Sequence, residues 1–417
     1  MKPLKDITVT VCDSGLFVFL AGALGPHVKK VYYCNPCASA FPKSAQLDLG
    51  TGYKEFEKIL DWHSVVDETD LFVFPDIYYA DVQLDLEARG KLVWGSRKGE
   101  KLETERVWSK RLMEGLGLAV GGYHVMNGIE ALKKHLKTHS NQYIKISATR
   151  GDAETQEAEE YDLVEGWIDD LASRLGARRD TQEFVCEDKI PDAIEMATDC
   201  YTVDGKFPKR CMWGIEAKAT SYIGLTGAPP KQLTELNEKL SKLFAKTSYR
   251  NFWAMEGRIT KDGVIHPIDA CCRMGSPPGE LVTLMYENLA EIMYMGAQGV
   301  LVEPKFKARY GVELMIHSSW LEKGHPVRVK FPPRLAPYVK LRNSCVRNGA
   351  HFVLPQGDNS PSLGGVVAVG DTLDAAIKKC KLIADQVRFI NRDVDPDSLD
   401  KSVAELKKLG EYGLQLG

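Results

Sequence analysis

Short apolar runs alternate with helix-length segments over the first hundred residues of the chain. Strands and helices that alternate in this way are typical of a doubly wound parallel sheet. The first helix is expected over residues 16–24, where apolar residues recur with a helical period and the run ends at Gly25-Pro26. The predicted strands of this region cover residues 7–12, 30–34, 70–75 and 91–94.

Two loops that follow strands of this sheet are candidate binding loops. In doubly wound sheets, ligands bind beyond the carboxyl ends of the strands. Asp13-Ser14-Gly15 and Pro75-Asp76 are therefore the places where a small substrate could be held. The first loop has one glycine instead of a dinucleotide-binding G-x-G-x-x-G pattern, and a plain strand-to-helix turn explains it equally well.

After a polar segment near Lys98, the pattern changes to mixed helices and strands. Residues 214–224 are expected to form a polar loop bounded by glycines, and residues 391–397 a polar linker. The predicted helices cover residues 105–114, 129–138, 231–246, 283–296, 372–387 (capped by Asp371 or Thr372) and 398–409. The predicted extended segments are residues 119–124, 143–146, 183–188, 193–201, 327–331, 351–354 and 365–369.

The most informative stretch runs from Trp253 to Gly279. Lys261-Asp262-Gly263, between two apolar runs, predicts two short strands joined by a tight turn. Antiparallel pairing would bring Glu256 and Asp269 side by side, which favours a cation such as Mg²⁺ between the two carboxylates. Arg273 follows in an irregular loop, where its guanidinium could hold an anionic group. The alternative is an ordinary hairpin whose two acids are solvated.

A lysine lies inside the apolar strand at residues 143–146. Because an unpaired buried ammonium is costly, Lys145 is expected to have an anionic partner. The small-residue loop 147–155 follows directly, and its backbone N–H groups and Arg150 could bind phosphates. This loop does not have the G-x-x-x-x-G-K-[ST] pattern of a Walker A motif. Glu195 could bind ribose hydroxyls, although a solvated strand end would look the same.

Composition narrows the class of protein. The 417 residues are enough for about three domains. The net charge of −3 does not indicate binding to nucleic acid or to an anionic membrane. Apolar runs of membrane-spanning length and a signal peptide are not recognisable, so we expect a cytoplasmic protein.

The ten cysteines are scattered, and several lie inside apolar strand-like runs. This distribution suits reduced, buried thiols better than a disulfide framework. Cys34 and Cys37 form one C-x-x-C pair, but they lack a second pair at zinc-binding spacing, so a metal or redox role is not favoured.

The order of these features resembles the ATP-grasp superfamily, in which two α+β subdomains clamp ATP. The resemblance implies that Lys110 lies near the α-phosphate and that Lys145 binds the α- and β-phosphates. It makes the 147–155 loop the phosphate lid, the Glu187 region the adenine hinge, and Glu195 the ribose ligand. The implied nucleotide-binding residues are Lys110, Lys145, Arg150, Gly151, Glu154, Thr155, Glu187 and Glu195.

The same resemblance assigns Glu256 and Asp269 as the Mg²⁺ ligands. The E-x-N-x-R motif of the superfamily stands here as Asp269-Ala270-Cys271-Cys272-Arg273. Cys271 therefore occupies the position of the ligating asparagine, and a thiol is a poor magnesium ligand. Either water or the acids complete the metal shell, or the metal site is weakened.

Within the superfamily, the chain is most similar to the glycinamide ribonucleotide synthetase family, nearly from end to end. Residues 90–95 with 109–113 resemble its strand and lysine helix, residues 268–277 its I-E-F-N-x-R-F-G-D-P segment, and residues 364–373 its C-terminal hybrid domain. Its G-G-G-R-E-H run for phosphoribosylamine is replaced by residues 13–17, Asp-Ser-Gly-Leu-Phe. The resemblance therefore supports the ATP chemistry but not the substrate.

The expected fold is an α/β and α+β ATP-grasp fold. An N-terminal doubly wound domain would cover residues 1–104, and an ATP-grasp domain of two subdomains residues 105–322. A hybrid-like α+β domain would cover residues 323–390, and residues 391–417 would be a linker and terminal helix.

The expected activity is that of an ATP-dependent carboxylate-amine ligase. With ATP and Mg²⁺, it would phosphorylate a small-molecule carboxylate and transfer the acyl group to an amine, of which an amino acid such as glycine is one candidate. Arg273 and Lys218 would hold the carboxylate and acyl-phosphate oxygens. Two alternatives stay open, a catalytically idle ATP-binding protein and a divergent glycinamide ribonucleotide synthetase. The substrates and the oligomeric state do not follow from the sequence.

Overall fold

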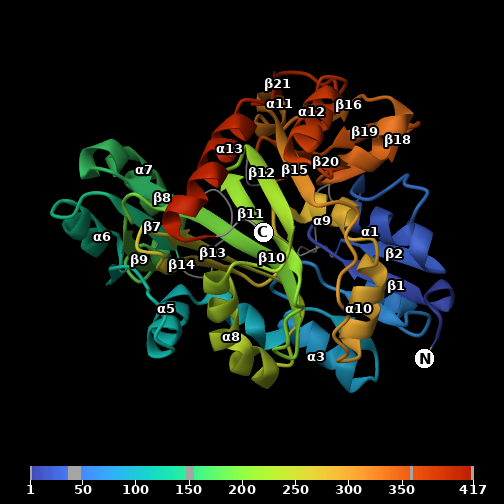
Figure 1. The fold of residues 1–417 in the computed structure, drawn as a ribbon, viewed down its shortest axis with the longest axis horizontal. Helices are drawn as coiled ribbons and strands as arrows, with labels where there is room; N and C mark the ends of the chain where they lie inside the picture. The colour runs from blue at the N-terminus through green and yellow to red at the C-terminus, as the bar shows by residue number, and fades with distance from the viewer. Residues whose placement is uncertain (1, 36–47, 147–154, 357–359, 415–417) are drawn as a thin grey trace.

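The computed structural model describes residues 2–35, 48–146, 155–356 and 360–414 of the chain. Figure 1 shows a parallel N-terminal sheet in blue and a long central sheet that runs through the middle of the molecule. A small four-stranded sheet lies at the left of that view, and the C-terminal elements lie above the N-terminal sheet.

The N-terminal sheet is the predicted doubly wound sheet. Its strands pair in parallel in the order β3-β2-β1-β4-β5. One face packs with helices α1 (Val18–Leu24) and α10 (Leu289–Ala297), and the other with α3 (Ala80–Ala88). The strands are β1 (Thr8–Cys12), β2 (Lys30–Cys34), β3 (Glu57–Ile59), which the sequence pattern did not predict, β4 (Leu71–Val73) and β5 (Leu92–Trp94).

The small antiparallel sheet has the strand order β6-β9-β7-β8. Two amphipathic helices share one apolar core with this sheet, and α7 was not predicted from the sequence. The elements are β6 (Tyr123–Asn127), α6 (Ile129–Leu136), β7 (Gln142–Ile146), β8 (Thr155–Ala158), α7 (Tyr161–Leu175) and β9 (Glu183–Asp188). Helices α4 (Lys101–Thr104) and α5 (Arg106–Gly115) precede this sheet in the chain.

The central sheet has the order β14-β13-β10-β11-β12-β15-β20-β17, with β21 paired to β15. Helix α8 packs against β10, and α13 packs across β11 and β12. The elements are β10 (Ile194–Val203), β11 (Cys211–Ala217), β12 (Ser221–Gly227), α8 (Lys231–Lys246), β13 (Arg250–Ile259), β14 (Ile265–Cys271), β15 (Tyr310–Ser318), β17 (Val339–Leu341), β20 (Ser362–Gly370), β21 (Arg392–Asp393) and α13 (Ser398–Lys408).

The C-terminal region contributes to this central sheet through β17 and β20, and it also has a small sheet of its own in the order β16-β19-β18. The side chain of Thr372 accepts a hydrogen bond from the N–H of Ala375, so Thr372 caps the predicted helix after residue 372. The remaining elements are α9 (Gly279–Met285), α11 (Ser319–Glu322), β16 (Val327–Val329), β18 (Ser344–Arg347), β19 (Ala350–Val353) and α12 (Leu373–Ala384).

The expectation of a polar loop over residues 214–224 is wrong. This segment forms most of the β11–β12 hairpin, in which Gly214 pairs with Gly224 and Ile215 with Ile223. The glycines do not end the strands; a Cβ on Gly214 would lie 2.5 Å from the Tyr222 hydroxyl, so glycine lets the buried tyrosine pack against the backbone.

Two further expectations need correction. The predicted helix 283–296 is two helices, α9 and α10, interrupted around Asn288, whose side-chain oxygen accepts a hydrogen bond from the Lys305 N–H. That contact ties the connecting loop to a distant segment, which apolar periodicity does not reveal. The linker expected over residues 391–397 includes β21, which pairs with the last two residues of β15, His317 and Ser318.

None of the helices in the described ranges combines the length and the apolar character needed to cross a membrane.

Candidate functional site

The predicted hairpin around Glu256 and Asp269 is present as β13 and β14. Its turn contains Gly263 at φ +79°, a conformation that glycine adopts readily. Glu256 and Asp269 are direct partners across the two strands, and the register shifts just after Glu256. The two carboxylates are therefore adjacent, as the turn position predicts.

Two buried cations contact Asp269. Lys145 Nζ lies 2.9 Å from its Oδ2, and Arg106 Nη1 lies 2.6 Å from its Oδ1. Burial alone would raise the pKa of Asp269, but Lys145 and Arg106 outweigh it and hold that pKa well below its usual range. The expected anionic partner of the strand lysine is thus Asp269, together with Glu187.

Both predicted lysines, Lys110 and Lys145, form ion pairs with Glu187. Lys110 Nζ is 3.0 Å from Glu187 Oε2, and Lys145 Nζ is 3.4 Å from Oε1. Burial lowers the pKa of Lys110, whereas the carboxylates of Asp269 and Glu187 outweigh burial and raise that of Lys145. With Arg106, the two lysines gather around these two carboxylates in a cluster, which we call the basic cluster. Its lysines line a cavity, where they could bind an anion.

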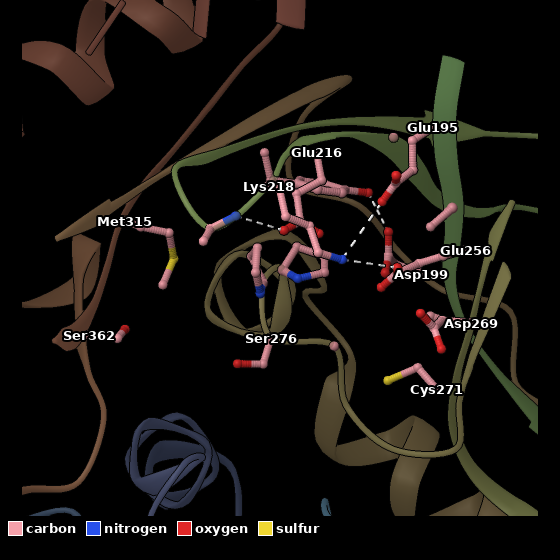
Figure 2. Close-up of a pocket in the computed structure, with 18 of the residues that line it drawn as sticks. Glu195, Asp199, Glu216, Lys218, Glu256, Asp269, Cys271, Ser276, Met315 and Ser362 are labelled. Atoms are coloured by element: carbon pink, nitrogen blue, oxygen red, sulfur yellow. Dashed lines mark hydrogen bonds and ion pairs between the residues drawn. The ribbon is translucent and has the colours of Figure 1, made fainter. Parts of the chain in front are cut away.

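A second cluster surrounds Lys218, as Figure 2 shows. Its Nζ lies 3.3 Å from Glu256 and 3.8 Å from Glu195, although the lysine side chain is 71% exposed. The charge of Glu256 is the main reason why the pKa of Lys218 is raised. Burial raises the pKa of Glu256, and Lys218 offsets part of this rise. Arg258 also reaches Glu195, at 3.2 Å.

Two cavities adjoin these clusters. The first has a volume of about 320 Å³ and the second about 460 Å³. Of the predicted site residues, Lys110, Lys145 and Glu187 line only the first, and Glu256 and Arg273 line only the second. Both cavities are lined by Thr155, Glu195, Lys218 and Asp269. The lysines and acids that the sequence singles out therefore lie where the two cavities meet.

Arg273 reaches the wall of the larger cavity from the loop after β14. Its Nε lies 2.9 Å from Glu103 Oε1 and 3.9 Å from Asp76 Oδ1. Asp76 in turn accepts a hydrogen bond from Ser14, so the two candidate binding loops of the N-terminal sheet do meet. The acids orient the guanidinium, and the residue also lines the space where an anionic group could bind.

The residues at the metal position fit a magnesium ion only in part. In the described part of the chain, no three His, Cys, Asp or Glu side chains are placed to hold a metal by themselves. Glu256 and Asp269 offer two carboxylates, which is the protein contribution that magnesium commonly has when nucleotide phosphates and water complete its shell. The Cys271 thiol contacts the carbonyl of Arg273 at 3.8 Å.

Part of the predicted phosphate lid, with Arg150, Gly151 and Glu154, lies outside the described residues. Thr155 is described; it opens β8 and pairs with Lys145 on β7.

The structure adds site residues that the sequence reasoning missed. Arg106 lies four residues before Lys110 on α5, hence on the same helix face, and that spacing was a usable signal. Glu216 lines the larger cavity; burial, with Glu256, raises its pKa to about 8. Buried Asp199 lines it too, with a hydrogen bond from the Tyr222 hydroxyl. Asp199 belongs to a predicted extended segment whose pairing the sequence left open, and Glu216 to the segment that was wrongly expected to be a polar loop.

No protein-family model matches the chain, and no curated protein matches its sequence. Solved structures do match. Phosphoribosylamine-glycine ligase from Thermotoga maritima is similar with a TM-score of 0.71 at 15% identity, over 94% of this chain and 100% of that one. Biotin carboxylase from Campylobacter jejuni, in an ATP complex, has a TM-score of 0.64 at 15% identity, over 97% and 99%. N5-carboxyaminoimidazole synthetase from Staphylococcus aureus, complexed with ADP, has a TM-score of 0.59 at 13% identity, over 92% of this chain and 99% of that one.

These neighbours are ATP-grasp enzymes, and they span nearly all of this chain. The expected ATP-grasp fold, with a parallel N-terminal sheet and antiparallel sheets after it, is confirmed. At such low identity, the similarity concerns the fold alone.

Proposed function

We propose that this protein is an ATP-dependent carboxylate-amine ligase. It would phosphorylate a substrate carboxylate with the γ-phosphate of ATP, and an amine would then displace phosphate to give an amide, ADP and phosphate. The observation that supports this most is the basic cluster, in which buried Lys110, Lys145 and Arg106 gather around Glu187 and Asp269 beside two cavities.

In this proposal, the 320 Å³ cavity holds the nucleotide. Lys145 and Lys110 bind its phosphates, and they release Glu187 and Asp269 in part when the stronger anion arrives. The Glu187 region lies beside the base, and Glu195 beside the ribose. Arg150, Gly151, Glu154 and Thr155 belong to the proposed phosphate lid.

Glu256 and Asp269 are the proposed magnesium ligands. When bound, the ion would neutralise charge on the phosphates during transfer. The protein keeps the two carboxylates together through the pairing of β13 with β14.

The 460 Å³ cavity is the proposed acceptor site. Arg273 and Lys218 line it and would hold the substrate carboxylate near the phosphates. Glu216 and Glu195 line the same wall, and their carboxyl oxygens can accept hydrogen bonds from an incoming ammonium group. A small acid and a small amine, such as an amino acid, are the proposed partners.

The cysteines support a reducing compartment. All those in the described ranges are buried and free of disulfides. We therefore propose a cytoplasmic location.

A second candidate function is ATP binding without ligase activity. It is favoured by Cys271, which takes the place of a metal ligand in the E-x-N-x-R motif.

A substrate screen tests the main proposal. Purified protein is incubated with ATP, Mg²⁺ and pairs of small carboxylic acids and amines, and ADP release and amide formation are measured. We expect ADP release that needs both substrates and disappears in Arg273→Ala. ADP binding without substrate-dependent release in any pair would favour the idle protein, and an unchanged amide yield in Arg273→Ala would remove the role of that arginine.

A further inference from the structure

The end of the 460 Å³ cavity that faces the C-terminal region has its own polar residues. Met315 and His317 point to one face of β15, and Ser362 is the strand partner of His317 on β20. Arg342 follows β17 and donates its N–H to the carbonyl of Leu363, which brings it to the same wall. Figure 2 shows Met315 and Ser362 on the opposite side of the cavity from Glu256 and Asp269.

Arg342 is only 6% exposed, yet its guanidinium is not fully hydrogen-bonded. Its Nε donates to the buried carboxylate of Glu280, and Nη1 lies 3.4 Å from the Ser362 hydroxyl. Within the described ranges, Nη2 meets only the thioether sulfur of Met315, at 3.9 Å. A thioether is a weak acceptor, so a buried, charged donor group is left without a strong partner at the cavity wall.

Glu280 fixes the direction of this guanidinium. It is fully buried on α9 and accepts a hydrogen bond from Nε, which holds the guanidinium in place, while Nη1 reaches Ser362 and Nη2 reaches Met315. Such a pre-oriented fork suits a carboxylate or a phosphate better than a flexible lysine would. The neighbouring His317 has its pKa lowered by burial, so at neutral pH its imidazole is uncharged and can donate one hydrogen bond.

We infer that Arg342, Ser362 and His317 form a second anion-binding subsite at the far end of the acceptor cavity. This inference rests on the proposed function, which makes this cavity the acceptor site, and it specifies the class of substrate. The acid to be activated would carry a second anionic group, a carboxylate or a phosphate, away from the reacting carboxylate. Arg273 and Lys218 would hold the reacting end and Arg342 the other end.

Matched pairs of small anions test the subsite by calorimetry on the full chain. Succinate is compared with butyrate, which has the same chain length and one charge less, and phosphoglycolate is compared with glycolate. We expect each dianion to bind about tenfold or more tightly than its monoanionic match. Preference for succinate over phosphoglycolate, or the reverse, distinguishes the carboxylate from the phosphate.

Three variants locate the effect. Arg342→Met should remove the preference for dianions, and Arg342→Lys should restore part of it. Ser362→Ala leaves the Arg342–Glu280 pair intact and should weaken dianion binding by a smaller factor, which guards against loss of folding in the arginine variant. Arg347→Met is the control, because Arg347 pairs with Asp48 and does not line the cavity.

Three outcomes would overturn the subsite and leave Arg342 as a structural link to α9. They are equal binding of dianions and monoanions, no binding of any dianion, and an unchanged preference for dianions in a folded Arg342→Met. Binding of Mg²⁺-ADP to the same samples separates this result from the fate of the proposed function. Dianion binding without ADP binding would keep the subsite and refute the ligase, whereas ADP binding without dianion preference would do the reverse.

Discussion

Glu256 and Asp269 face each other across β13 and β14, but their pKa values are shifted in opposite directions. Burial raises the pKa of Glu256, whose cationic neighbour Lys218 is 71% exposed. Asp269 is buried too, but Lys145 and Arg106 are themselves almost fully buried and outweigh that effect. One acid of the pair is thus part of the basic cluster, and the other forms its ion pair with an exposed lysine.

The first prediction concerns stability. Asp269→Asn should lower the melting temperature strongly, because it leaves Lys145 and Arg106 without their shared carboxylate; breaking a buried ion pair costs about 3–5 kcal/mol. Glu256→Gln is the matched control on the opposite strand and should have a much smaller effect. Thermal unfolding at pH 7 measures both. Equal losses in the two variants would show that the basic cluster does not stabilise the fold.

The second prediction concerns nucleotide binding. Lys145→Met should reduce the affinity for Mg²⁺-ADP by about tenfold or more, because a charge-assisted contact to phosphate is lost. Lys133→Met, in the same region, removes a lysine that pairs with Asp169 at the surface and should leave the affinity unchanged. Calorimetry on samples with confirmed melting transitions gives both values. If a folded Lys145→Met binds as well as the unaltered protein, the phosphates are bound elsewhere.

Local sequence signals were enough for the hairpin and for most of the N-terminal sheet, although they did not indicate its short strand β3. The turn at residues 261–263 fixes the register of β13 and β14, and that register places Glu256 opposite Asp269. Likewise, an ammonium inside an apolar strand requires a partner, so the pairing of Lys145 could be foreseen without knowing which acid supplies it. Both inferences depend on neighbours within one hairpin or one strand.

Long-range strand pairing was not accessible in the same way. Arg342 reaches the acceptor cavity because β17 pairs with β20, and β20 pairs with β15. Glu216 enters the site through the β11–β12 hairpin, whose glycines resemble loop residues in the sequence but here let Tyr222 pack closely. The pairing of β15, β20 and β17 is set by tertiary packing, so neither periodicity nor turn chemistry indicates it, whereas the β11–β12 hairpin is local and was missed because of its glycines.

The third prediction concerns pH and Glu216. Burial, with the charge of Glu256, raises its pKa from 4.5 to about 8 in the folded protein. Between these values the unfolded chain ionises while the folded protein still holds the proton, so this group lowers stability as pH rises and its effect levels off above about 8. The stability of Glu216→Gln relative to the unaltered protein should therefore increase from pH 5 to pH 8. Melting curves of both proteins at several pH values measure this difference in stability. A difference that stays constant with pH would contradict the raised pKa of Glu216.

The fourth prediction concerns the metal position. Cys271→Asn places an amide oxygen where the proposed site has a thiol, and oxygen is the ligand that magnesium prefers. The Mg²⁺ concentration at which ADP binding is half-maximal should then fall, by about tenfold if the amide reaches the ion. Cys272→Ser, the adjacent thiol, whose sulfur bonds to the Gly99 carbonyl, is the control and should leave that concentration unchanged. An unaltered magnesium requirement in a folded Cys271→Asn would mean that Cys271 does not face the ion, and the proposed role of the E-x-N-x-R position would have to be abandoned.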